Sequence, residues 1–148
     1  MRTVVILMAV ILLGCNTSDH KPITGKWYTY AESGDYMELW LGDDKAMSYL
    51  SSIDEFLLYE LNRDDSLLSF SLIESRITEA HEFQLRVEKS SDELFQAIFI
   101  GEGKVNPLKT YFLVSSETPR LSGSLETNKE NMLELLSRME GSHDGHGH

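Results

Sequence analysis

Cysteine is almost absent from this chain of 148 residues, in which Cys15 stands alone. One thiol cannot form an intramolecular disulfide, so the fold must be stabilised by buried side chains. Basic residues are also scarce, because 13 Lys and Arg are set against 24 Asp and Glu, a net charge of −11 at pH 7. No cluster of Lys and Arg offsets this charge, which repels nucleic acid and anionic lipid headgroups. The composition therefore argues against nucleic acid as a partner.

The motifs that carry hydrolytic or nucleotide chemistry are absent as well. The sequence has no Gly-x-Ser-x-Gly, no His-Glu-x-x-His and no glycine-rich loop of the kind that holds a phosphate. The acidic pairs Asp43-Asp44 and Asp64-Asp65 fall in predicted turns, where aspartate commonly bonds to the local backbone. Neither pair has the ligand spacing of a calcium loop. We therefore predict a non-enzymatic protein that needs no cofactor.

A long apolar run occurs only at the N-terminus, from Val4 to Leu13. Arg2 precedes this run and the small residue Gly14 follows it. Ten apolar residues are too few to span a bilayer, but the combination is typical of a secretory signal. The domain boundaries predicted from this pattern are a signal peptide over residues 1–14, Cys15 with a polar linker over 15–22, a β domain with a C-terminal helix over 23–141, and a flexible His-rich tail over 142–148.

The tetrapeptide Leu12-Leu13-Gly14-Cys15 resembles the lipobox of bacterial lipoproteins. The resemblance implies that Cys15 becomes the lipidated N-terminus, palmitate being one such acyl group, and anchors the domain to the cell envelope outside the cytoplasm, facing the periplasm or the surface. More than one acyl chain is needed for stable anchoring, and this modification supplies them. Asn16, in place of aspartate, favours the outer membrane over the inner one. Loss of residues 1–14 removes Arg2 and leaves 12 basic against 24 acidic residues, a net charge of −12.

Short strands separated by turn signals are predicted between Ile23 and Val114, a pattern typical of an antiparallel barrel or sandwich. The clearest strand is 81–89, where Phe83, Leu85 and Val87 face one way and polar residues face the other. Apolar residues on both faces of 94–100 predict a central or covered strand. The predicted strands are 24–30, 36–41, 46–50, 55–62, 67–73, 81–89, 94–100 and 108–114.

After Val114 the pattern changes to that of a helix. Thr127 and Glu130 fit a capping box, and Gly141 is typical of a residue that ends a helix. We expect this short amphipathic helix to pack on the outside of the sheet. Its apolar residues at helical spacing are Met132, Leu135, Leu136 and Met139.

The first predicted strand opens with Gly25-Lys26-Trp27. A glycine and a tryptophan two residues apart, at the start of an up-and-down meander, resemble the opening strand of the lipocalins. The resemblance implies a mostly β fold, an antiparallel up-and-down barrel of about eight strands with one C-terminal α-helix. It also implies that Trp27 closes one barrel end against a basic residue near the last strand. A small barrel of this kind either holds one small ligand or fills its interior with side chains.

Two groups of residues are candidates for binding. Aromatic residues of the first half of the chain either line a cup for an apolar ligand or belong to an ordinary core. The ligand-binding candidates are Trp27, Tyr28, Trp40 and Tyr59. The C-terminal tail either collects a borderline cation such as Zn, Cu or Ni, or binds no metal. Its candidate ligands are His143, Asp144, His146 and His148.

Three functions follow from these features. The leading one is a membrane-anchored lipoprotein whose lipocalin-like domain binds a small apolar ligand without catalysis. The second is an acidic module that docks on, or inhibits, a basic protein of the cell envelope. The third is a metal-handling protein that acts through the tail.

Overall fold

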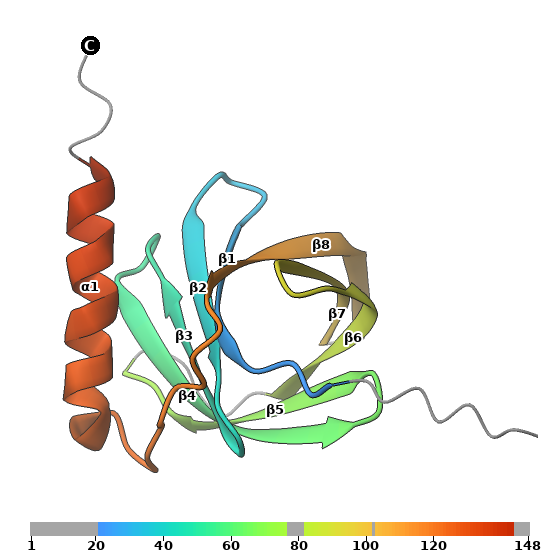
Figure 1. The fold of residues 1–148 in the computed structure, drawn as a ribbon, viewed down its shortest axis with the longest axis horizontal. Coiled ribbons are helices and arrows are strands. Elements are labelled where there is room, and N and C mark those ends of the chain that lie inside the picture. The colour runs from blue at the N-terminus through green and yellow to red at the C-terminus, as the bar shows by residue number, and fades with distance from the viewer. Residues whose placement is uncertain (1–20, 77–81, 102, 144–148) are drawn as a thin grey trace, which may run out of the picture.

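A computed structural model describes residues 21–76, 82–101 and 103–143 of the chain. Its strands form a closed antiparallel barrel in which each strand pairs with the next and the last pairs with the first (Figure 1). The predicted up-and-down barrel with one C-terminal helix is thus confirmed. The strands are β1 (Gly25–Tyr30), β2 (Tyr36–Leu41), β3 (Lys45–Leu50), β4 (Glu55–Asp64), β5 (Leu67–Glu74), β6 (Glu82–Ser90), β7 (Leu94–Gly101) and β8 (Lys104–Ser115).

The last strand is longer than the sequence predicted, because it begins at Lys104 instead of Leu108. Pro107 has no N–H to donate and is normally excluded from a paired strand. The pairing of β7 with β8 accommodates it through a register shift, since Ile98 pairs with Leu108 while Ile100 pairs with Val105. Two residues of β8 therefore stand opposite one of β7, which is the arrangement of a β-bulge.

The inner faces of the strands make one apolar core that runs through the barrel. Strand alternation accounts for it, because the residues predicted to share a face, such as Phe83, Leu85 and Val87, all point inward. The buried members of this core are Trp27, Leu39, Leu41, Ala46, Leu57, Tyr59, Leu61, Leu68, Phe70, Leu85, Phe95, Ala97 and Tyr111.

Gly25 begins β1 with a φ of 110°, a conformation that L-residues rarely adopt. A Cβ atom at this position would lie 2.7 Å from the carbonyl oxygen of Ser115, at the end of β8. Glycine therefore lets the first and last strands meet where the barrel closes. Two residues later, Trp27 points inward and meets Phe95 in a nearly perpendicular contact, with ring centroids 4.9 Å apart. The cations that lie over an indole ring in the described ranges are both at Trp40, and neither lies over the ring of Trp27.

Helix α1 (Lys129–His143) packs on the outside of β2, β3 and β4, as predicted (Figure 1). It follows a short 3₁₀ helix, η1 (Glu126–Asn128). Thr127 lies inside this turn, where its N–H donates to the Ser124 hydroxyl over 3.3 Å, so the predicted capping box is not formed. The helix also continues past Gly141, because one glycine costs a helix only about 1 kcal/mol. The buried residues between helix and barrel are Trp40, Met47, Tyr49, Phe56, Leu58, Leu125 and Leu135.

The outer face of β7 and β8 lies across the barrel from α1 (Figure 1). The apolar residues that suggested a covered strand are arranged there as cross-strand pairs, Leu94 with Phe112 and Ile98 with Leu108. Such pairs stabilise a sheet by contact between neighbouring strands, without a second layer above them. Leu108 and Phe112 keep 49% and 40% of their surface exposed, so the elements of the described ranges leave this face largely open.

Candidate ligand cavity

A cavity of about 220 Å³ lies inside the barrel, toward the end at which β1 finishes and β2 begins. Its walls come from every strand except β5, because inward-pointing residues of each of the other strands converge on it. The lining residues are Thr29, Met37, Leu39, Leu50, Leu57, Tyr59, Phe83, Leu85, Phe99 and Tyr111. None of them is a charged residue, so the described part of the lining is suited to apolar groups.

Aromatic rings form one wall of the cavity. Phe83 of β6 is stacked on Phe99 of β7, with ring centroids 5.0 Å apart and planes 21° from parallel. Tyr59 of β4 meets Phe83 almost at a right angle, with centroids 5.3 Å apart. These contacts hold the rings in defined orientations, since aromatic pairs prefer offset-stacked or perpendicular geometry. The wall is therefore a set of rings in mutual contact, presented as one continuous aromatic surface.

Hydroxyl groups are the polar features of the lining. The Thr29 hydroxyl donates to the Thr110 carbonyl oxygen over 2.8 Å and is thereby satisfied. Tyr111 stacks on Phe95 with centroids 4.5 Å apart and is 6% exposed, and its hydroxyl has no hydrogen-bond partner in the described part of the chain. Burial raises the pKa of Tyr111 to about 12, and burial likewise raises the pKa of Tyr59. Both phenols are therefore protonated at neutral pH.

The four aromatic residues predicted to bind a ligand are separated by the barrel wall. Tyr59 lines the cavity, and Trp27 lies inside the barrel at its other end, where β1 begins. Tyr28 and Trp40 point outward, the former toward Phe112 with centroids 5.4 Å apart and the latter under α1 with no exposed surface. The cavity residues that the sequence reasoning did not choose include Phe83 and Tyr111, although strand alternation had already placed Phe83 on the apolar face of its strand.

Trp40 belongs to a polar cluster that fastens α1 to the barrel, made of Lys26, Glu38, Trp40, Glu134 and Arg138. The Glu38 carboxylate has no exposed surface, and it accepts hydrogen bonds from the Trp40 indole over 2.7 Å and from Arg138 over 2.7 Å. Glu134 accepts from Lys26 over 2.6 Å and from Arg138 over 2.8 Å. The Lys26 ammonium lies 4.4 Å from the centre of the Trp40 ring. The Arg138 Nε is buried without a hydrogen-bond partner among the described residues, but both carboxylates and the Trp40 indole are paired within the cluster. We therefore assign the Glu38 cluster a structural role.

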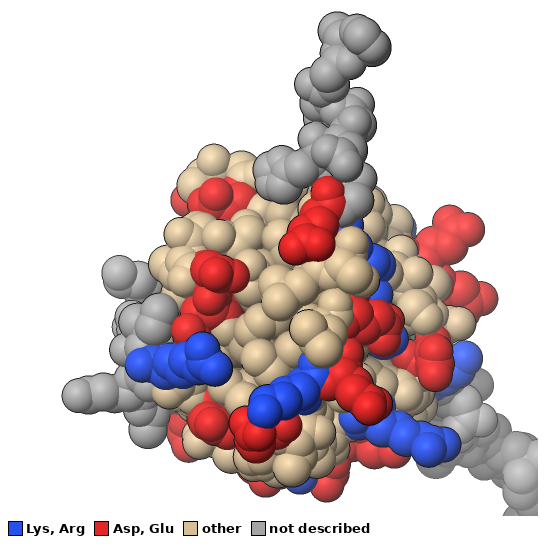
Figure 2. Space-filling view, turned by 90° about the vertical axis from the view of Figure 1, so that its left-hand side faces the viewer, with Lys and Arg blue, Asp and Glu red and all other residues tan. Residues whose placement is uncertain are grey.

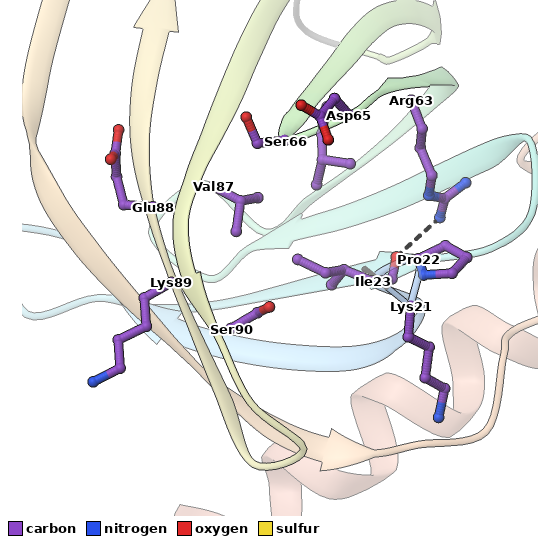
Figure 3. A pocket seen from close by; sticks show the side chains of 11 residues that line it. Lys21, Pro22, Ile23, Arg63, Asp65, Ser66, Val87, Glu88, Lys89 and Ser90 are labelled. Atoms are coloured by element: carbon purple, nitrogen blue, oxygen red, sulfur yellow. Dashed lines mark hydrogen bonds between the residues drawn. The ribbon is translucent and has the colours of Figure 1, made fainter. Parts of the chain in front are cut away.

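A larger hollow of about 440 Å³ lies at the other barrel end, where β4 turns into β5 (Figure 3). Its rim carries charges of both signs, including Lys21, Asp65 and Glu88. Arg63 donates from its guanidinium to the carbonyl oxygens of Gly42 over 2.6 Å and of Ile23 over 3.0 Å. Arg63 therefore links β4 to the turn after β2 and to the segment before β1, while its Nε is buried and has no hydrogen-bond partner among the described residues.

The remaining sequence candidates lie at the chain ends. Cys15, Asp144, His146 and His148 fall outside the described residues, and His143 is the last residue of α1. Within the described ranges no three His, Cys, Asp or Glu side chains gather as metal ligands would, and no helix is long and apolar enough to cross a bilayer. On the side that α1 covers, acidic and basic side chains are interspersed and do not form a patch of one sign (Figure 2).

In comparisons with known proteins, no family model matches the chain, and no curated protein or solved structure matches it significantly.

Proposed function

We propose that this protein is a lipid-anchored component of the bacterial cell envelope whose lipocalin-like barrel binds a small apolar ligand and carries out no chemistry. The observation that supports ligand binding is the 220 Å³ cavity inside the closed barrel, lined by apolar and aromatic side chains. Small-molecule sites are typically concave and mostly apolar, with a few polar groups that fix orientation. Thr29, Tyr59 and Tyr111 are the polar residues of this cavity.

The chemistry of the lining favours binding over catalysis. General acid–base catalysis needs a group that gains or loses a proton near neutral pH. The described lining offers no carboxylate, imidazole, thiol or amine. Its two tyrosines have pKa values raised by burial, which moves them further from the neutral range.

The binding proposal is tested with isopropylbenzene as the probe, on a chain that starts at Asn16. Such a chain keeps every contact described above, because all of them lie within residues 21–143. We expect saturable one-site binding by calorimetry and a rise in melting temperature with probe concentration. Leu50 lines the cavity, so the larger side chain of Leu50→Trp should fill it and prevent binding. Leu133→Trp makes the same substitution on the exposed face of α1 and is the matched control. Equal binding by both variants, or no saturable binding by the parent chain, would contradict the proposal.

The anchoring proposal is tested separately on native membranes. We expect mass spectrometry of the N-terminal peptide to find Cys15 acylated and residues 1–14 removed. Cys15→Ser should leave the protein unacylated, and the protein should then no longer sediment with the membranes. Recovery of wild-type protein with a free thiol and an intact leader would contradict the envelope assignment without affecting the barrel.

A further inference from the structure

We propose that the cavity selects an uncharged, largely hydrocarbon ligand, about the size of one substituted ring, that presents a single hydrogen-bond acceptor to the hydroxyl of Tyr111. This inference rests on the proposed ligand-binding function and specifies the class of ligand. It follows from the state of one hydroxyl, the charge of the lining and the volume of the cavity.

The first observation concerns Tyr111, which is 6% exposed and lines the cavity. Other tyrosines on this barrel have partners: Tyr36 donates to Glu38 over 2.6 Å, and Tyr49 donates to Asp54 over 2.6 Å. Tyr111 has none among the residues that the structure describes. The hydroxyl is not among the buried side-chain atoms that lack a partner, so it is accessible from the cavity that Tyr111 lines. An acceptor supplied by a ligand would therefore gain a bond that the empty protein does not make.

The orientation of Tyr111 is fixed by its neighbours. Its ring lies 7° from parallel with that of Phe95, and Phe95 in turn meets Trp27 nearly at a right angle. The phenol is therefore held in place before any ligand enters. Because burial raises the pKa of Tyr111 to about 12, the group remains a hydrogen-bond donor at neutral pH.

The second observation is the charge of the lining. A buried carboxylate or ammonium needs a partner of opposite charge, and the described lining offers none. Lys109 lies two residues before Tyr111 on β8, where it pairs with Ala97 of β7. It is not among the residues that line the cavity. A ligand that carries a charge into the cavity would lose its hydration without an ion pair in return.

The third observation is size. A cavity of about 150 Å³ holds one benzene molecule in another protein, so about 220 Å³ corresponds to on the order of nine heavy atoms. Phe83 and Phe99 present a stacked aromatic wall against which a flat ring can lie. The geometry therefore favours a single ring with a short polar substituent over a long acyl chain.

The test uses three probes of nearly equal shape: isopropylbenzene without an acceptor, acetophenone with a carbonyl acceptor, and benzoate with a charge. Affinities are measured by calorimetry at pH 7 for the chain that starts at Asn16 and for Tyr111→Phe. Tyr28→Phe is the matched control, because Tyr28 points outward and lies away from the cavity. Circular dichroism checks that each variant is folded.

We expect Tyr111→Phe to lower the affinity for acetophenone by about fivefold relative to the affinity for isopropylbenzene, which is the effect of one lost hydrogen bond. Tyr28→Phe should leave that ratio unchanged, and benzoate should bind at least about tenfold more weakly than acetophenone. A ratio unaltered by Tyr111→Phe, or benzoate binding as tightly as acetophenone, would overturn the inference while leaving apolar binding intact. If none of the probes binds saturably to the parent chain, the proposed function itself fails.

Discussion

The docking of α1 on the barrel gives a direct test of the architecture, because the helix carries two leucines in opposite environments. Leu135 has no exposed surface and packs between the helix and the outer wall of the barrel, whereas Leu133 is 66% exposed. Truncating each to alanine removes the same atoms from the same helix. The difference between the two variants therefore isolates the burial of one side chain from any change in helix propensity.

The expected magnitudes follow from the burial of each residue. A fully buried Leu→Ala substitution costs 2–5 kcal/mol, and a contact between a helix and a barrel can partly close over the gap, so we expect Leu135→Ala to lose about 3 kcal/mol. With an unfolding entropy near 2.1 cal/mol/K per residue, this corresponds to a fall of about 10 °C in melting temperature. Leu133→Ala should lie within about 0.5 kcal/mol of the parent.

Urea unfolding, followed by both tryptophan fluorescence and circular dichroism, measures these values. The two tryptophans report on different places, since Trp40 lies under α1 and Trp27 lies inside the barrel. Coincident transitions by the two methods indicate that helix and barrel unfold together. Equal losses in Leu133→Ala and Leu135→Ala, or a loss below about 1 kcal/mol in the latter, would refute the packing described here.

Three further predictions follow from individual residues. Gly25→Ala should lower the free energy of unfolding in urea by about 2 kcal/mol or more, because it adds a clash with Ser115 to an unfavourable φ. Gly34→Ala, where φ is also positive but the space is open, should lower it by only about 1 kcal/mol. Equal losses in the two variants would contradict the clash as the reason. Tyr111→Phe should leave the ligand-free protein as stable as the parent. By the same assay Tyr36→Phe should lower the free energy of unfolding by about 1.5 kcal/mol, because it loses a hydrogen bond to the Glu38 carboxylate. A loss of that size in Tyr111→Phe would show that the Tyr111 hydroxyl already has a partner. The hydrogen bond from Lys26, with that from Arg138, lowers the pKa of Glu134 against the opposing effect of burial. Its stabilisation is therefore fully present above the ordinary glutamate pKa of 4.5 and is lost as pH falls through the lowered native pKa. The difference between the parent and Glu134→Gln should be largest at neutral pH and vanish in strong acid. A difference independent of pH would contradict this assignment.

Much of the barrel was predictable because its information is local. The strand 36–41 was predicted with the bounds observed for β2, since the alternation of Met37, Leu39 and Leu41 with polar or aromatic residues marks an inner face directly. The interior residues Phe83, Leu85 and Val87 of β6 followed from the same rule. Helix α1 was also visible in the spacing of its apolar residues, although its start depended on a 3₁₀ turn that no pattern indicated.

The parts that were not predictable depend on contacts between distant segments. Glu38 alternates like a solvent-facing residue of β2, yet it is fully buried because Arg138, one hundred positions later, lies over it. Trp40 was predicted to bind a ligand because the sequence does not say which face of β2 the helix covers. For the cavity, alternation placed Phe83 on the apolar face of its strand, but its meeting with Tyr111 in one space depends on the closure of the barrel.

The closure that makes the cavity also removes a hazard. An open sheet ends in strands with unpaired N–H and C=O groups, which can recruit a strand from a second molecule and seed aggregation. Here β1 is paired with β8 as well as with β2, so no strand of the ring offers such an edge. Copies of this barrel can therefore crowd against one another without adding to each other's sheets.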